Sequence, residues 1–131
     1  MIAVDTSVVV RYLVGTPPEQ ARRAGVLLDG SDQIGVPIVV LLESGHVLRT
    51  QYGVARPAVL EALLEFVTRS DIETLGLSKA VVVETLARAQ ILPGAPLADA
   101  LVVASARDAG AERLASFDAG MGRHGITVVE P

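Results

Sequence analysis

The chain has 131 residues, of which 50% are hydrophobic and 20% charged, so it can bury one core and is not expected to be disordered. Its formal net charge of −4 argues against a protein that holds nucleic acid by bulk positive charge. The lack of cysteine excludes disulfides, thiolate metal sites and cysteine nucleophiles, and two histidines make a multi-histidine zinc site improbable.

The sequence indicates neither a transmembrane nor a secretory segment. The densest apolar run, Val36–Leu42, contains Pro37 and ends at Glu43, so it is too short to cross a membrane. The N-terminus reaches Asp5 without the basic segment of a signal peptide. We therefore expect a cytoplasmic protein with no membrane partner, folded as a single domain over residues 1–131.

Short apolar strands alternate with helices along the chain. Thr6 and Ser7 precede the first helix as candidate caps, and Asp118 begins a short turn or helix. The expected strands are Ile2–Val4, Gln33–Val36, Ile72–Leu75, Glu112–Ser116 and Thr127–Val129. The expected helices are Val8–Val14, Glu19–Leu28, Ile38–Tyr52, Pro57–Thr68, 79–90 behind a Ser78 cap, and Leu97–Ala109.

This alternation predicts an α/β fold, with a central parallel sheet of four to five short strands and helices on both faces. Sites in such folds lie at the carboxyl ends of the strands. Residues directly after the strands are therefore the first candidates for chemistry.

Four acidic residues stand at positions of interest. Asp5 follows the first strand and Asp118 follows the fourth, so both lie at the edge of the sheet where sites form. Glu43 and Asp99 lie on helices with valines three and four residues away, and we expect both to face the apolar side.

Each of these acids also has a plainer explanation. The two that follow strands are good N-caps, and Asp99 complements the dipole of its helix. For Glu43 the plainer solution is a salt bridge to Arg49 or Arg11. A carboxylate on an apolar face costs roughly several kcal/mol unless it is paired or bound to a metal, so Glu43 is the hardest to explain structurally.

Taken together, the four acids indicate a metal site. Crowded carboxylates repel one another, and a divalent cation removes that repulsion. Mg²⁺ and Mn²⁺ prefer oxygen ligands, usually one or two carboxylates with water and substrate phosphate. Sites of this kind act on phosphodiesters, where the metal activates water and stabilises the transition state.

The basic residues are almost all arginine, with Lys79 as the only lysine. Arginine makes bidentate phosphate contacts, although a GC-rich coding bias is the weightier explanation of the excess. His46 is a candidate to support a metal ligand, and His124 is expected in a loop. The candidate phosphate contacts are Arg11, Arg49, Arg107 and Arg123.

Four segments that carry the acids extend over nearly the whole chain. They are IAVDTS at 2–7, LLESGHVL at 41–48, PLADALVVASA at 96–106 and LASFD at 114–118. In this order and spacing the chain resembles the PIN-domain nucleases, and specifically the VapC-type toxins of bacterial toxin–antitoxin pairs.

The resemblance implies a three-layer, Rossmann-like PIN fold and an endoribonuclease that cleaves single-stranded or loop RNA with one or two Mg²⁺ or Mn²⁺ ions. Thr6 and Ser116 match hydroxyl residues that orient ligands or water. The acidic quartet of the family falls on Asp5, Glu43, Asp99 and Asp118.

The resemblance also implies protein partners. These are a second copy of the chain, in a homodimer, and a VapB-type antitoxin that inserts a segment into the site. The toxin–antitoxin complex binds operator DNA through the antitoxin, so the chain itself meets that DNA only indirectly.

Other classes of protein fit less well. A phosphotransferase with an aspartyl nucleophile after its first strand usually has a second Asp two residues on, where this chain has Ser7. Such a phosphotransferase also needs a lysine near the phosphate, and this chain offers only Lys79. A receiver domain needs an early acidic pair, which this chain lacks. A catalytically inactive PIN-fold module that acts through a protein partner stays open, and Glu43 on an apolar stripe argues against it.

Overall fold

The computed structural model describes residues 1–30 and 32–131. The strands are β1 (Ile2–Ala3), β2 (Ile34–Pro37), β3 (Ile72–Leu75), β4 (Arg113–Ala115) and β5 (Thr127–Val129). The helices are α1 (Thr6–Val14), α2 (Pro18–Gly30), α3 (Ile38–Thr50), α4 (Arg56–Val67), α5 (Lys79–Gln90), α6 (Leu97–Asp108) and the short 3₁₀ helix η1 (Ala119–His124). The predicted order of elements is confirmed, and most boundaries agree to within about two residues.

All strand pairs in the described residues are parallel, as the alternation of elements predicts. β2 lies between β1 and β3, with Ile34 opposite both Ile2 and Ile72. β4 pairs with β5 in a second sheet, with Leu114 opposite Val128. The α/β class with parallel strands is therefore confirmed.

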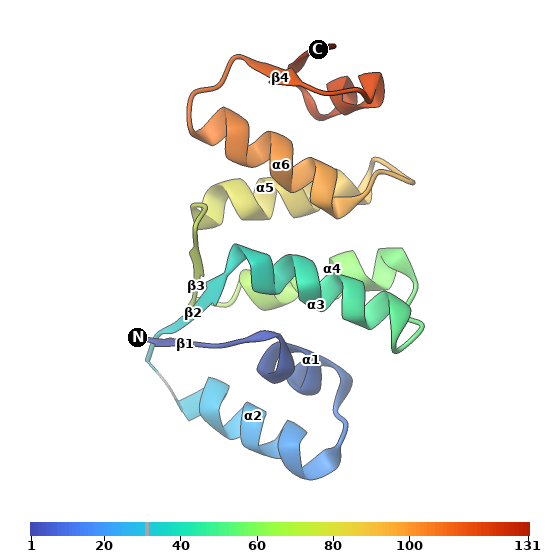
Figure 1. Ribbon diagram of the computed structural model, residues 1–131. Helices are drawn as coiled ribbons and strands as arrows, with labels where there is room; N and C mark the ends of the chain where they lie inside the picture. The colour runs from blue at the N-terminus through green and yellow to red at the C-terminus, as the bar shows by residue number, and fades with distance from the viewer. Residues whose placement is uncertain (31) are drawn as a thin grey trace.

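The division into two sheets differs from the single sheet of four to five strands that we expected. β1 and β4 are only two and three residues long, so a ladder between them would contribute few hydrogen bonds. α6 packs against α5 and leads the chain away from β1. Figure 1 shows β4 beyond α6, at the top of the view and away from β1, with α5 and α6 between the two strands.

The longer helices stack in pairs. α1 packs on α2, α3 on α4 and α5 on α6, while α1 also contacts α3 and α4 contacts α5 (Figure 1). We call β1 through α5 the body, and residues 113–129, which hold β4, η1 and β5, the C-terminal lobe. α6 connects the two.

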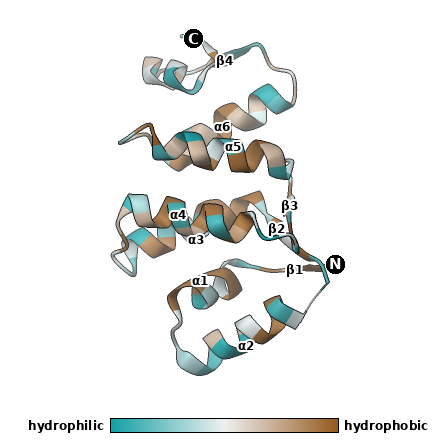
Figure 2. Cartoon of the chain, turned by 180° about the vertical axis from the view of Figure 1, so that it is seen from behind, coloured by the Kyte–Doolittle hydropathy of each residue, from teal (hydrophilic) through white to brown (hydrophobic). Residues whose placement is uncertain are grey.

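The body and the C-terminal lobe have separate apolar clusters. The main cluster runs through the body, where Leu63, Val9 and Ile34 are fully buried, and Figure 2 shows apolar residues along the helices that face one another. The second cluster is small and is built on Val103, Met121 and Ile126. Apolar burial is the main stabilising term of a fold, so the body is the more stable region.

Arg69, after α4, connects several elements of the body. Its guanidinium donates to Asp71 at 2.7 Å, to Asp29 at 3.1 Å and to the hydroxyl of Tyr12 at 2.7 Å. The carboxylate of Asp71 holds the pKa of Arg69 above its ordinary value, and Arg69 in turn lowers the pKa of Asp71. This network fixes the ends of α1, α2 and α4 next to the sheet.

Candidate functional site

Asp5 and Glu43 line the same open cavity, of about 470 Å³, between the start of α1 and the exposed side of α3. β1 delivers Asp5 at its carboxyl end, where the sequence placed a site. Glu43 comes from the second turn of α3, which begins directly after β2. The other lining residues are Thr6, Ser7, Val10, Arg11, Val39, Val40, Val47, Gln51 and Tyr52.

Local hydrogen bonds hold the carboxylate of Asp5 in place. The Ser7 hydroxyl donates to Asp5 Oδ1 at 2.6 Å, and the Val8 amide donates to the same oxygen at 3.3 Å. These bonds, led by the one from Ser7, lower the pKa of Asp5, so the group is ionised at neutral pH. Asp5 is therefore the N-cap of α1, which was one of its two expected roles, in place of Thr6 or Ser7, and it still lines the cavity.

Glu43 is exposed, which corrects the expectation that it lies along an apolar stripe. The valine one turn earlier, Val39, is 63% exposed, whereas Val40 beside it is 8% exposed and belongs to the main cluster, so Glu43 lies at the border between solvent and core. Within the described residues Glu43 forms no ion pair with Arg49 or Arg11. Its carboxylate is thus free to bind a ligand, and Glu43 needs no metal ion to offset a cost of burial.

Arg11 is the candidate phosphate contact that the structure places beside the two acids. Its guanidinium donates to the Ser7 carbonyl at 3.4 Å and to the side chain of Gln20. Arg49 is exposed on α3 but does not line the cavity, and neither does the exposed His46. Thr6 does line it, whereas the importance of Ser7 for Asp5 was missed because Ser7 was considered only as a cap.

Asp99 and Asp118 do not line this cavity. Asp99 is half-buried in the first turn of α6, and Asp118 is the exposed N-cap of η1, accepting from the Gly120 amide at 2.8 Å. Ser116, directly after β4, accepts from the Asp118 amide at 3.0 Å, and Figure 1 shows β4 far from α1. The structure thus brings together two of the four predicted acids and leaves the other two elsewhere.

The cavity has the donor chemistry for a hard divalent ion, but only in part. In residues 1–30 and 32–131, no group of three or more histidine, cysteine, aspartate or glutamate side chains is arranged to hold a metal. Two carboxylates and open space for water are within the range that Mg²⁺ uses in proteins. Asp5 and Glu43 therefore supply two of the oxygen ligands that such an ion needs, and Asp99 and Asp118 do not complete the set in this arrangement.

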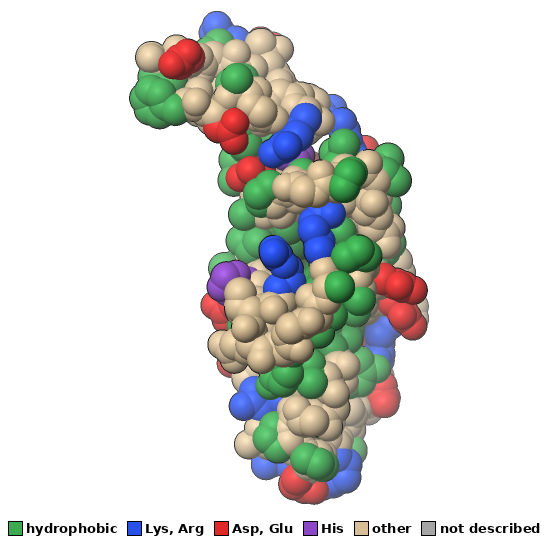
Figure 3. Space-filling model, turned by 90° about the vertical axis from the view of Figure 1, so that its right-hand side faces the viewer, with side chains coloured by type: hydrophobic (Ala, Val, Ile, Leu, Met, Phe, Trp, Pro, Cys, Tyr) green, Lys and Arg blue, Asp and Glu red, His purple; other side chains and the backbone are tan. Residues whose placement is uncertain are grey.

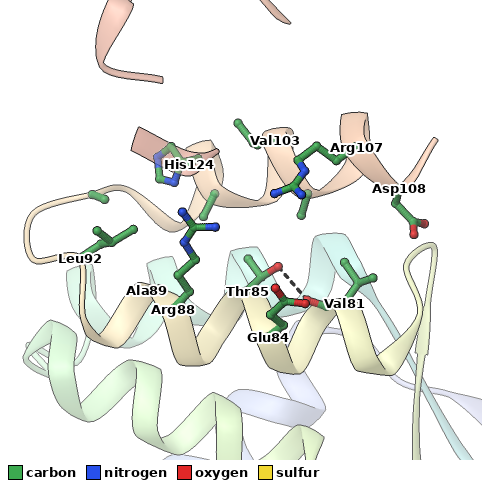
Figure 4. A pocket seen from close by; sticks show the side chains of 13 residues that line it. Val81, Glu84, Thr85, Arg88, Ala89, Leu92, Val103, Arg107, Asp108 and His124 are labelled. Carbon is green, nitrogen blue, oxygen red and sulfur yellow. Dashed lines mark hydrogen bonds between the residues drawn. The ribbon is translucent and has the colours of Figure 1, made fainter. Parts of the chain in front are cut away.

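A second pocket, of about 270 Å³, lies between α5 and α6 (Figure 4). Arg88, Arg107 and His124 reach it from three elements. His124 is the last residue of η1, which corrects its expected place in a loop, and it is only 6% exposed. Sequence reasoning considered Arg107 only as an RNA contact and gave Arg88 no role, because no local pattern joins these three positions.

Two features define the class of protein: the parallel α/β fold, and the acidic side chain of Asp5 after the first strand. The chain belongs to the PIN-domain family, since the model of that domain matches residues 2–126. PIN domains are generally nucleases, so the fold is a nuclease fold. No curated protein matches the chain closely enough to count as a relative. None of the helices in the described residues has the length and apolar character needed to span a bilayer.

Proposed function

We infer that the chain is a metal-dependent endoribonuclease of the VapC type, which hydrolyses phosphodiester bonds of single-stranded or loop RNA in the cytoplasm. The observation that carries this inference is the shared cavity of Asp5 and Glu43, at the carboxyl end of β1 in a PIN domain. Arg11 at the same cavity supplies a positive charge for the RNA backbone.

Asp5 and Glu43 would hold one Mg²⁺ or Mn²⁺ ion. When bound, the ion supplies a Lewis acid for the phosphate and lowers the pKa of water. Ser7 and the Val8 amide keep Asp5 ionised and oriented, and Thr6 lies beside them. Glu43 is exposed and has no ion-pair partner in the described residues, so its side chain would be able to change conformation to meet the ion.

Asp99 and Asp118 would complete the quartet, with Ser116 orienting the last acid, when α6 and β4 come to lie beside the free edge of β1. That edge is open, and Met1 and Ile2 on it are 72% and 49% exposed. In this arrangement α6 packs on α5, and β4 of the same chain lies beyond α6, away from that edge (Figure 1). A second copy brings its own β4 to this edge without breaking that packing, which supports a homodimer.

The surroundings of the cavity also favour a protein partner. Val39 and Tyr52 line it and are 63% and 42% exposed, so a partner that covers them would bury apolar surface beside the two acids. A VapB-type antitoxin that covers these side chains and blocks Asp5 and Glu43 would silence the nuclease. Operator DNA would then be contacted through the antitoxin, and Arg49, Arg107 and Arg123 stay candidate RNA contacts.

The direct test is cleavage of RNA by the purified chain with Mg²⁺ or Mn²⁺, read by mapping new 5′ ends. We expect Asp5→Asn and Glu43→Gln each to lower the rate on the order of a thousandfold. Asparagine still caps a helix, so Asp5→Asn should unfold at nearly the wild-type urea concentration. Glu65→Gln, on the exposed side of α4, removes the same charge and should cleave normally.

The alternative is an inactive PIN-fold module that acts only by binding a protein. The separation of Asp99 and Asp118 from the Asp5 cavity favours it, and the exposure of Glu43 removes the argument against it. This alternative predicts no cleavage of RNA with Mg²⁺ or with Mn²⁺. It also predicts that Glu43→Gln and Glu65→Gln do not differ in cleavage, whereas the nuclease requires that they do.

A further inference from the structure

The pocket between α5 and α6 collects positive charge at one point. A Cβ atom placed on Gly125 would lie 3.2 Å from Arg107 Nη1 and 3.4 Å from Arg88 Nη1, so both guanidinium groups approach the same position. Figure 4 shows the two side chains extending from facing helices toward His124. Both side chains are exposed, so solvent screens their mutual repulsion in part, and an anion bound between them would remove it.

No acidic side chain in the described part of the chain neutralises these two arginines. Neither forms an ion pair there, and Arg88 Nη2 donates to the Arg123 carbonyl at 3.4 Å. Glu84 and Asp108 also line the pocket, but Figure 4 shows Asp108 at the far end of α6 and Glu84 beside Thr85. Figure 3 shows basic side chains near the waist below the C-terminal lobe.

His124 is the second, independent sign of a ligand. The residue is 94% buried by its exposed fraction of 6%, yet its Nε2 atom has no hydrogen-bond partner in the described residues. A buried polar atom without a partner costs free energy, and such atoms are uncommon in native proteins unless a ligand or water serves them. In Figure 4 the imidazole faces Arg88 across the pocket.

We propose that this pocket binds the phosphate monoester of a nucleotide, held by Arg88, Arg107 and His124. A phosphate monoester carries a charge close to −2 and three terminal oxygens, which matches two guanidinium groups and one imidazole better than a carboxylate does. The apolar side chains of Leu92, Ala89 and Val103 line the same pocket and would contact the nucleoside. None of these residues lines the Asp5 cavity, so the site does not depend on the nuclease assignment.

The experiment is a titration of the full-length chain with inorganic phosphate, then with AMP, followed by NMR of the imidazole protons. The chain has only two histidines, so exposed His46 is an internal reference for His124. We expect the His124 signals to move on binding and its apparent pKa to rise, against burial and the charges of Arg123 and Arg88 and with the help of Asp99. A titration in which His124 and His46 move alike, or not at all, would overturn the proposal.

Variants separate the pocket from bulk charge. Arg88→Gln and Arg107→Gln should each weaken AMP binding by about tenfold or more, and Arg88→Lys should bind with intermediate strength because it keeps the charge but loses the fork. Arg23→Gln, exposed on α2, removes the same charge and should bind like the wild type. Equal weakening by Arg23→Gln and Arg88→Gln would show non-specific attraction and reject the site.

The source of the phosphate is resolved by two further probes. A short oligoribonucleotide with a 5′-phosphate should compete with AMP if the pocket takes the end of an RNA chain, and the same oligomer without the phosphate should not. If AMP binds and neither oligomer competes, the ligand is a free nucleotide. Competition by the unphosphorylated oligomer to the same degree would contradict recognition of a monoester.

Discussion

The body and the C-terminal lobe carry the two halves of the candidate metal site, and the structure treats them differently. Asp5 and Glu43 are on the body, beside a strand that pairs with β2 and above the main apolar cluster. Asp118 is on the lobe, and Asp99 begins the helix that leads to it, where only three residues form the buried cluster. Asp5 and Glu43, on the body with its large core, share one cavity within a single chain. Asp99 and Asp118, next to the small core, lie outside that cavity.

The sharpest test of this comparison is a mixture of two inactive variants. Asp5→Asn damages the body half of the site, and Asp99→Asn damages the other half. If each chain places its lobe on the β1 edge of the other, an exchange that leaves α6 packed on α5, a heterodimer has one site with all four acids, and co-refolding should restore about a quarter of the wild-type rate. Cleavage of RNA by each variant alone and by the mixture measures this.

The matched control is Asp5→Asn mixed with Glu43→Gln, because both changes lie in the same half and no heterodimer site is intact. An active wild type with no recovery in the first mixture would show that the site closes within one chain. An inactive wild type would instead defeat the nuclease proposal itself, so the two failures are distinguishable.

Cross-linking checks the same exchange without measuring activity. The natural chain has no cysteine, so a mixture of Ala3→Cys on β1 and Ala115→Cys on β4 contains only the introduced thiols. We expect oxidation to give a covalent heterodimer on a non-reducing gel, whereas Ala3→Cys with Glu65→Cys should stay uncoupled. Equal coupling in the two mixtures would mean random collision and not pairing of strands.

Core substitutions test whether the two regions differ in stability. Leu63 is fully buried in the body, and Leu63→Ala should lower the free energy of unfolding by about 3 kcal/mol or more. Met121 is 6% exposed in the small cluster, and Met121→Ala should cost less, because the lobe opens locally at lower free energy. Urea unfolding and hydrogen exchange measure both, and a larger cost for Met121→Ala would contradict the comparison.

The Arg69 network should contribute a smaller part of the stability of the body. Arg69→Met leaves Asp71 without its cationic partner and removes the bond to Tyr12, so we expect a loss of about 2 kcal/mol in urea unfolding. Arg22→Met breaks the exposed ion pair with Glu19, at 2.8 Å, and should change little because solvent screens that pair. Similar losses in the two variants would show that Arg69 acts only as a surface charge.

Local chemistry made much of this fold predictable from sequence. Ser78 caps α5 as expected, accepting from the Val81 amide, and Asp5 follows the first strand and faces a cavity. The pairing of β4 was not predictable, since it depends on a few hydrogen bonds weighed against the packing of α6 on α5. The exposure of Glu43 was missed because spacing identifies neighbouring valines but does not say which of them are buried.

The α5–α6 pocket was beyond sequence reasoning for a similar reason. Arg88, Arg107 and His124 lie on three elements, and their meeting depends on how α6 packs on α5 and where η1 returns. Only the burial of His124 and its unpartnered Nε2 atom mark the place as unusual. Such a site is found from tertiary contacts and not from a motif.

The smallest expected effect is the dependence of stability on pH that comes from His124. Burial lowers the pKa of His124 below the ordinary 6.5, and Arg123 adds to this, so the folded chain binds this proton less readily than the unfolded one. The contribution of neutral His124 is therefore complete above pH 6.5 and is lost as the pH falls below it, toward the lowered pKa. In phosphate-free buffer, the free energy of unfolding of the wild type, measured with urea, should fall more from pH 7.5 to pH 5.5 than that of His124→Asn does. His46→Asn should keep the wild-type slope, while Asp5 and Asp71, whose pKa values are lowered, stay ionised over this range. An unchanged slope in His124→Asn would mean that this imidazole is hydrated, and would weaken the case for a ligand at its Nε2 atom.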